Sequence, residues 1–311
     1  MSIDENKDNA PYPGLRPYRE DEKAKFFGRD VDAEILIDKV LTNRLTLLFA
    51  ASGVGKSSLL QAAVIPHLKS KTGENLTVVY HTDWVSDPVR SVRDAVLQAL
   101  RVEGLLPEHS EEAEFGEKLP DLLAFCEVFV RPPLVLILDQ FEEFFRYQRH
   151  QTGFRELIDQ LTTIITDKSL PVHLILSMRE DFALELNAFK PKLPTILFEN
   201  FYRLEKLGRQ AVRDAIIRPI ENTEVTYENG LADLILNDLS INSFFNGLFS
   251  IHERLPSEKI ELAYLQVVCS FLWRTSKARC EKIISTDRYL RSGCTLGILG
   301  KYLGILHIHP K

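Results

Sequence analysis

The sequence predicts an α/β fold, in which a parallel sheet is followed by an all-helical second part. Continuous apolar runs at 44–50, 133–139 and 172–178 alternate with segments of helical periodicity. This is the pattern of parallel strands that are covered by helices on both faces. A glycine-containing loop separates the first apolar run from the helix that follows it. After about residue 205 the strand signals stop and only helical periodicity remains.

The individual elements follow in order along the chain. Three prolines in the polar segment 1–25 favour extended or turn structure over helix. The apolar or alternating runs predict four strands, at 44–50, 76–84, 133–139 and 172–178. Apolar residues at helical spacing predict helices at 30–41, 57–68, 88–102, 122–130 and 154–165. We therefore divide the chain into an extended segment at 1–25, a core at 26–204 and a helical part at 205–311.

Composition narrows the class of protein. The chain has 311 residues, 45% of them hydrophobic and 26% charged, with a net charge of -6. An acidic balance argues against a nucleic-acid partner, since phosphate binding needs a basic surface. The N-terminus is polar and acidic rather than a signal peptide, and no apolar run reaches the roughly 18 residues of a membrane span. The four cysteines show no C-x-x-C spacing. We expect a cytoplasmic protein with reduced thiols and no membrane contact.

The loop after the first strand carries a nucleotide-binding motif. Residues 50–57 read A-A-S-G-V-G-K-S, which differs from G-x-x-x-x-G-K-[ST] only by Ala50. In such a loop the backbone N–H groups and a helix N-terminus surround a phosphate, the lysine contacts the β/γ-phosphates and the hydroxyl ligates Mg²⁺. Alanine is the smallest replacement for the first glycine. The predicted nucleotide-binding residues are Ser52, Gly53, Val54, Gly55, Lys56, Ser57 and Ser58, with Ser57 also a metal ligand.

An acid follows the strand at 133–139. Asp139 ends this apolar run, where a carboxylate can support Mg²⁺ in the role called Walker B. The next residue is Gln140, which can orient water but accepts a proton poorly. Glu142 and Glu143 follow, and either could act as general base if the chain turns helical there. The sequence leaves the choice between them open, and helix-start acids stabilised by the helix dipole are the alternative for both.

The strand at 172–178 also ends in polar residues. Ser177 and Arg179 would lie beside the γ-phosphate if this strand neighbours the first one. Arg179 could then sense whether that phosphate is present. The alternative is a surface arginine that pairs with Glu180 or Asp181.

These motifs, in this order, resemble a known family. The quoted stretches are NAPYPGLRPYREDEKAKFFGRDVDAEIL, SGVGKSSLL, LILDQFEEFF, LILSMREDF and LAYLQVVCSFLW. Together they are similar to the novel STAND NTPases, which are signal-transduction ATPases with numerous domains. The resemblance covers roughly residues 10–295 and implies an ASCE-type P-loop NTPase core with a helical lid. It implies that the strand with the sensor lies between the loop strand and the Walker B strand.

The resemblance also implies further nucleotide contacts. The stretch FFGRD is similar to the family motif near the adenine, so Phe27, Gly28 and Arg29 become candidates on the base or ribose side. Pro219 resembles the lid proline that contacts the base in related proteins, although it could equally be a helix terminator. The cofactors that the resemblance implies are ATP or ADP with Mg²⁺.

The family consists of switches more than metabolic enzymes, so the resemblance implies a slowly hydrolysing switch in bacterial signalling or defence. ADP would hold a closed state, and ATP with a trigger would permit homo-oligomerisation. An effector and a sensor would then lie on another chain or be missing by truncation, and the glycine-rich tail at 293–311 is atypical for a family helix. A non-hydrolysing nucleotide-binding scaffold is the alternative. A DNA-associated initiator or transposition-type ATPase is a third interpretation, with 273–282 as its one basic candidate.

Overall fold

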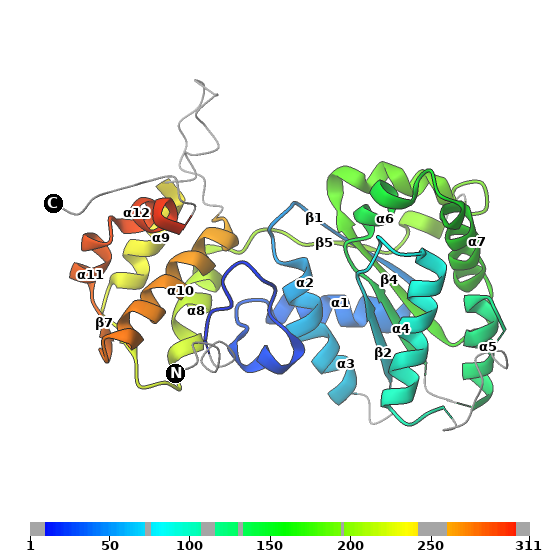
Figure 1. The fold of residues 1–311 in the computed structure, drawn as a ribbon, viewed down its shortest axis with the longest axis horizontal. Coiled ribbons are helices and arrows are strands. Elements are labelled where there is room, and N and C mark those ends of the chain that lie inside the picture. Colours follow the sequence, from blue (N-terminus) through cyan, green and yellow to red (C-terminus); the bar gives the residue numbers. More distant parts are fainter. Residues whose placement is uncertain are drawn as a thin grey trace, which may run out of the picture. The chain divides into compact units, whose positions relative to one another are not determined.

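The computed structural model describes residues 10–71, 76–106, 116–129, 133–193, 196–241 and 260–302. Its strands are β1 (Leu45–Ala50), β2 (Thr77–His81), β3 (Leu134–Leu138), β4 (Val172–Arg179), β5 (Phe201–Arg203), β6 (Thr226–Tyr227) and β7 (Ile283–Ile284). Its helices are α1 (Asp30–Thr42), α2 (Lys56–Leu59), α3 (Ile65–Lys71), α4 (Pro88–Val102), α5 (Leu119–Phe129), α6 (Phe141–Gln148), α7 (Thr152–Thr166), α8 (Arg209–Ile217), α9 (Leu231–Ile241), α10 (Leu262–Ala278), α11 (Thr286–Arg291) and α12 (Cys294–Tyr302). Figure 1 shows them along the chain.

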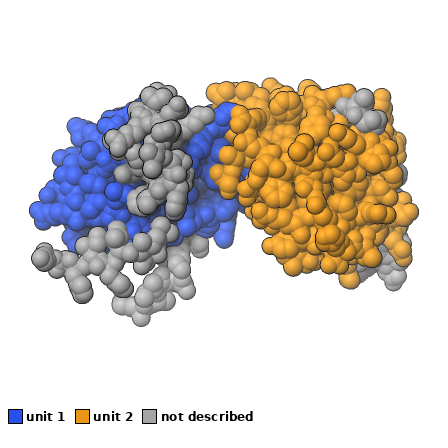
Figure 2. Space-filling model, turned by 90° about the horizontal axis from the view of Figure 1, so that it is seen from above, with its two compact units in different colours: residues 1–30, 53–63, 205–311 blue, residues 31–52, 64–204 orange. Residues whose placement is uncertain are grey.

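The chain divides into two compact units, which Figure 2 colours separately. We call residues 31–52 and 64–204 the sheet unit. We call residues 1–30, 53–63 and 205–311 the lid unit. Most of the residues of the phosphate-loop motif therefore belong to the lid unit, together with the N-terminal segment.

The sheet has five parallel strands in the order β2-β3-β4-β1-β5. The prediction that the sensor strand lies between the loop strand and the Walker B strand is confirmed, because β4 lies between β1 and β3. In the register, Leu138 is opposite Leu176 and Leu48 is opposite Ser177. The carboxyl ends of β3, β4 and β1 therefore meet at the same edge of the sheet.

The sheet unit has a continuous core. Every residue of β1 and β3 is buried, as the unbroken apolar runs indicate. Helices α4 and α7 pack against each other and bury Val92 and Leu161 completely. The helix α4 begins at a cap in which the side chain of Asp87 accepts from the amide of Arg90 at 2.8 Å, with Pro88 in the first helical position.

Two features of the fold differ from the sequence expectation. The edge strand β5 was not predicted, because its three residues are half-exposed or exposed and give no apolar run. The predicted helix at 57–68 is interrupted, since a π-helical stretch at Leu60–Val64 lies between α2 and α3. Such stretches are found mostly inside α-helices and often at functional sites.

The lid unit is built from helices, as predicted, apart from the two-residue strands β6 and β7, which pair in parallel. Its core contains Ile216, Leu236 and Val268 from α8, α9 and α10. Tyr12 from the N-terminal segment lies in the same core, and its hydroxyl donates to the carbonyl of Ile216. This segment, which the sequence presented as extended and separate, is thus part of the lid.

The glycine-rich end of the chain forms helix α12 as far as Tyr302, and the residues beyond it lie outside the described part. Residues 107–115 also lie outside the described part. Within the described ranges, no helix combines the length and apolarity that a bilayer crossing needs.

Candidate functional site

Asp139 is held rigidly where β3 ends. Its side chain is completely buried. One carboxylate oxygen accepts from the hydroxyl of Ser177 on β4 at 2.6 Å, and the other accepts from the hydroxyl of Tyr80 on β2 at 2.8 Å. Its backbone carbonyl accepts from the indole N–H of Trp84 at 2.8 Å. Three adjacent strands therefore fix the orientation of one carboxylate.

A sharp turn follows this aspartate. Gln140 has a φ of 52°, in the left-handed region that non-glycine residues adopt at a cost of roughly 1–2 kcal/mol. Helix α6 begins directly after it, and the amide of Glu143 donates to the carbonyl of Gln140 at 2.8 Å. Phe141 and Phe144 of α6 are buried and stack at 5.0 Å between ring centroids. The turn and this packing explain why both glutamates lie in the first turn of a firmly anchored helix.

The two glutamates have different surroundings. Glu142 is 6% exposed, and its carboxylate accepts from the backbone amide of Arg179 at 3.2 Å, two residues after Ser177 on β4. The side chain of Glu143 is 24% exposed and pairs with Arg146 at 3.0 Å, one helical turn away. Glu142 is thus tied to the edge of the sheet where Asp139 lies, whereas Glu143 makes the surface ion pair of an ordinary helix.

Arg179 is the last residue of β4. Its guanidinium makes two hydrogen bonds to Asp181, at 3.0 and 2.6 Å, and lies over the ring of Phe182. The hydrogen bonds raise the pKa of Arg179 and lower that of Asp181. The neighbouring Glu180 pairs instead with Arg203 of β5. The alternative that the sequence left open, an arginine paired with a nearby acid, describes this geometry, and a sensing role remains a prediction.

The phosphate loop has the backbone that its glycines predict. Gly53 and Gly55 have φ values of 75° and 98°, which a side chain would make unfavourable. Gly55 is the N-cap of α2, and the amide of Leu59 donates to its carbonyl at 2.9 Å. Lys56 and Ser57 follow as the first residues of the helix. Free amides at such a terminus are suited to an anion.

Ala50 has a different position from these glycines. It is the last residue of β1, lies opposite Arg179 in the register and is completely buried. It is not among the residues with a positive φ. A β-strand backbone accommodates an alanine side chain, so the departure from the usual first glycine leaves the loop geometry intact.

Arg29 connects two remote parts of the lid unit. It is 4% exposed, and its guanidinium donates to the carbonyl of Val54 at 2.9 Å and to the carbonyl of Glu205 at 2.8 Å. Val54 lies in the middle of the loop motif, and Glu205 opens the helical part of the chain. Arg29 therefore positions the loop backbone, and its predicted contact with a base or ribose remains a prediction.

The other residues of the predicted base side lie near each other. Gly28 has a φ of 88°, and an added Cβ would be 2.6 Å from the carbonyl oxygen of Ala211. The guanidinium of Arg218 stands 4.2 Å above the centre of the Phe27 ring. Pro219 is buried in the 3-10 turn that follows α8. Phe27 is thus joined to the turn of Pro219 through Arg218, which sequence reasoning did not single out.

Sequence reasoning also missed Tyr18 and Tyr80. The backbone amide of Tyr18 donates to the hydroxyl of Ser58 at 3.2 Å, and its own hydroxyl accepts from Gln266 of α10 at 3.3 Å. Tyr80 fixes Asp139 from β2. No signal singled out Tyr80, because it lies in the middle of the strand predicted at 76–84 and near the end only of the observed β2. Tyr18 offered none, because its contacts are remote in sequence.

The carboxylate of Asp139 and its surroundings fit a magnesium ion. Mg²⁺ keeps several waters and needs only one or two carboxylates from the protein. An ionised carboxylate has about four acceptor positions, and the two hydroxyl donors of Ser177 and Tyr80 use two of them. In the predicted Walker B role, the remaining positions would accept hydrogen bonds from metal-bound water.

The strand order β2-β3-β4-β1-β5, the glycine loop between β1 and α2 and the acid at the end of β3 define a P-loop NTPase of the ASCE type with a helical lid. The family model described as Novel STAND NTPase 1 matches residues 11–302. The chain belongs to this family. A search among curated proteins finds no significant match.

Several solved structures have a similar fold. The Walker-type ATPase PABY2304 of Pyrococcus abyssi has a TM-score of 0.58 and 14% identity, over 94% of this chain and 75% of that chain. The ADP form of the Aeropyrum pernix ORC2 protein has a TM-score of 0.59 and 13% identity, over 94% and 72%. The ORC1 protein of the same organism, in complex with DNA, has a TM-score of 0.57 and 15% identity, over 91% and 67%. At such identity these likenesses establish the fold alone.

Proposed function

We propose that this chain is an ATP-binding switch that hydrolyses ATP slowly and acts in signalling. Membership of the STAND NTPase family supports a nucleotide-dependent ATPase. The observation that carries the proposal is the pair of buried carboxylates at one sheet edge. Asp139 is fixed by Ser177 and Tyr80, and Glu142 is bound to the amide of Arg179. Acidic side chains gathered at the carboxyl edge of a parallel sheet are candidates for metal support and general-base catalysis, which supports the proposal.

Each of these residues has a proposed role in binding the nucleotide or its metal ion. Lys56 and the loop amides from Ser52 to Ser58 would hold the phosphates, and Ser57 would ligate Mg²⁺. Asp139 would hold the waters of that ion, which when bound neutralises charge on the β- and γ-phosphates. Phe27, Gly28, Arg29 and Pro219 are proposed on the base side.

Glu142 is the proposed general base. A water attacks the γ-phosphorus, its proton passes to the Glu142 carboxylate, and ADP leaves with the bridging oxygen. Burial at 6% exposure and the contact with β4 support Glu142 over Glu143. Arg179 would sense the γ-phosphate after exchanging its bonds with Asp181 for bonds to the phosphate oxygens.

The switch rests on differential affinity. ADP and ATP bind one site, and a ligand shifts a conformational equilibrium only by its difference in affinity for the two states. We propose a cytoplasmic protein in bacterial signalling or defence that self-associates when ATP is bound. Its effector and sensor would lie on another chain or on parts of the protein outside this sequence.

The test is ATP turnover with nucleotide binding measured in parallel. Lys56→Ala should lose both binding and turnover, and Glu142→Gln should lose turnover while it keeps binding. Turnover that survives Lys56→Ala would contradict the proposal, because the activity would then arise elsewhere. Size-exclusion chromatography with ATP and with ADP tests the proposed self-association separately.

Gln140 favours a second candidate function. It stands directly after Asp139, where many hydrolysing relatives have an acid. A scaffold that binds nucleotide without turnover would show ATP binding and no phosphate release in the wild-type protein. The DNA-associated alternative has support from the fold of ORC1, which was solved with DNA. The net charge of -6 argues against it.

A further inference from the structure

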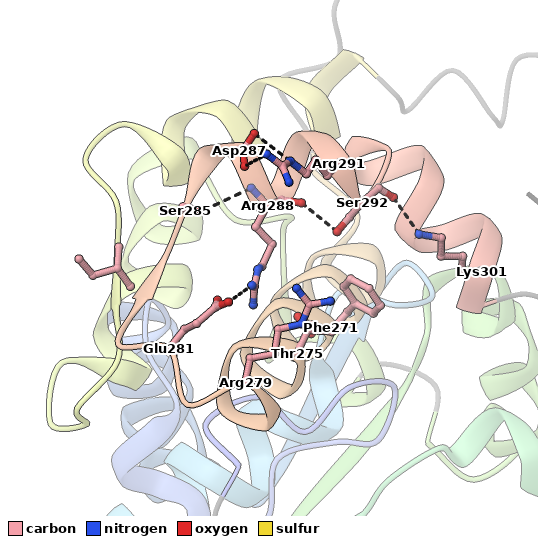
Figure 3. A pocket seen from close by; sticks show the side chains of 11 residues that line it. Phe271, Thr275, Arg279, Glu281, Ser285, Asp287, Arg288, Arg291, Ser292 and Lys301 are labelled. Carbon is pink, nitrogen blue, oxygen red and sulfur yellow. Dashed lines mark hydrogen bonds and ion pairs between the residues drawn. The ribbon is translucent and has the colours of Figure 1, made fainter. Parts of the chain in front are cut away.

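The lid unit contains a pocket remote in sequence from every nucleotide motif. Its volume is about 610 Å³. It lies between the end of α10, the strand β7 and the helices α11 and α12, and Figure 3 shows the side chains that line it. Four cations and two carboxylates face it, namely Arg279, Arg288, Arg291, Lys301, Glu281 and Asp287. The pocket is thus positively charged in a chain whose net charge is -6.

Arg288 is oriented by its surroundings. Its guanidinium pairs with Glu281 and also donates to the hydroxyl of Ser276, which is completely buried, at 3.3 Å. The side chain of Arg288 is only 13% exposed. Because these contacts already order the guanidinium, it loses little further conformational entropy when a ligand binds, and this favours binding. Figure 3 shows Arg288 reaching across the pocket towards Glu281.

The other cations keep donors available. Arg291 pairs with Asp287 at 2.9 Å, and Lys301 donates to the carbonyl of Ser292 at 3.4 Å. Within the described part of the chain, the guanidinium of Arg279 has no hydrogen bond or ion pair. A guanidinium has five N–H donors, so two paired arginines and one unpaired arginine leave many unused. Unused donors around a concave surface are suited to an anion.

The remaining lining residues suggest what the anion carries. Thr275, Ser285 and Ser292 contribute hydroxyl groups, and the two carboxylates can accept from ligand hydroxyls. The volume lies within the range of roughly 300–1,000 Å³ that small-molecule sites occupy. Glu281 and Asp287 would repel the continuous phosphate backbone of a nucleic acid, which needs a basic surface. Guanidinium groups bind phosphate in a bidentate manner.

We propose that this pocket binds a small phosphate ester that carries hydroxyl groups, such as a phosphorylated sugar. Arg279, Arg288 and Arg291 bind the phosphate, and the carboxylates and hydroxyls select the polyol part. The site shares no residue with the phosphate loop, so the lid unit has a second ligand besides the nucleotide. The proposal does not depend on ATP hydrolysis.

The test uses fructose 1,6-bisphosphate as the probe. Isothermal titration is carried out on the full chain with saturating MgADP, so that the phosphate loop is occupied. The variant Arg279→Gln/Arg291→Gln removes two cations of the pocket. The control Arg274→Gln/Lys277→Gln removes two exposed cations of α10 that do not line it. We expect the affinity to fall at least about tenfold in the pocket variant and to stay within about twofold in the control.

Three outcomes would overturn the proposal. Wild-type protein that does not bind the probe at millimolar concentration has no such site. Equal weakening in both variants would indicate diffuse electrostatic attraction. Binding of a DNA duplex that depends on Arg279 and Arg291, without binding of the sugar phosphate, would assign the surface to a nucleic acid. Both arginines are exposed, so the double variant should fold. Thermal unfolding of this variant, and of the single variant Arg279→Glu, checks that the fold is kept.

Discussion

The two adjacent acids of α6 allow a sharp test of the catalytic assignment. Glu142→Gln and Glu143→Gln each change one oxygen to an amide nitrogen, one residue apart in the same helical turn. Glu142 is buried against the amide of Arg179, and Glu143 pairs with Arg146 at the surface. The two substitutions have the same chemistry and different surroundings, so each serves as the control for the other.

The expected losses of turnover in the two variants differ by orders of magnitude. Loss of a general base lowers turnover by about 10²–10⁴-fold, which corresponds to roughly 3–5 kcal/mol in the activation barrier. Glutamine at 142 can still accept from the amide of Arg179, so we expect the fold to lose no more than about 1 kcal/mol. Glutamine at 143 loses one surface ion pair, which is typically worth about 0.3–0.5 kcal/mol, and its kcat should stay within about twofold of the wild type.

The assay is phosphate release under saturating ATP and Mg²⁺, with ATP affinity measured for each variant. Both variants should bind ATP as the wild type does, because neither residue belongs to the phosphate loop. A Glu143→Gln variant that loses as much turnover as Glu142→Gln would refute the reasoning from burial. A Glu142→Gln variant with wild-type kcat would exclude Glu142 as the base.

Four further perturbations test the supporting structure. Asp139→Asn should lower Mg²⁺-dependent turnover by at least about 10²-fold, because an amide nitrogen would face a hydroxyl donor, and circular dichroism checks the fold. Arg29→Met should destabilise the chain by about 2–4 kcal/mol in thermal unfolding, since two backbone carbonyls lose a charged donor. Gly28→Ala should lower the free energy of unfolding by at least about 2 kcal/mol, because alanine is strained at a φ of 88° and its Cβ would clash with a backbone oxygen. Gly14→Ala, with a φ of 76° and open space around it, should lower it by only about 1 kcal/mol. Burial raises the pKa of the Cys126 thiol to about 11, so the folded state keeps a proton that the unfolded state releases. Stability should therefore fall as the pH rises from about 9 towards 11, and alkylation of this cysteine should require unfolding.

The sheet was predictable because its strands are buried on both faces. The apolar runs that became β1, β3 and β4 could hardly adopt another structure, and they were found with their bounds nearly correct. The strand β5 lies at the edge, with two of its three residues exposed and the middle one partly buried, so its sequence carried no such signal. Periodicity therefore identifies the centre of a parallel sheet and misses its edge.

The candidate site was predictable as far as local motifs extend. Asp139, Lys56 and Ser57 follow from strand ends and loop spacing. The proposed choice of Glu142 over Glu143 did not follow from the sequence. It depends on the left-handed turn at Gln140, and no local propensity requires a glutamine there. The contacts of Arg29 likewise join residues that are 25 and 176 positions apart, which one sequence cannot reveal.

Within the lid unit, the N-terminal segment connects the phosphate loop to the helical part. Tyr18 bonds to Ser58, directly after the loop motif, and to Gln266 of α10. Arg29 bonds to Val54 inside the loop and to the carbonyl that precedes the lid helices. A loop that changed shape with its nucleotide would have to carry these partners along or break their hydrogen bonds. A neutral hydrogen bond is worth about 0.5–1.5 kcal/mol and one from a charged donor about 1.5–3 kcal/mol, a range that overlaps the typical allosteric coupling energies of about 1–3 kcal/mol. In the proposed switch, these few contacts would be strong enough to transmit a nucleotide state to the lid helices and weak enough to be broken by it.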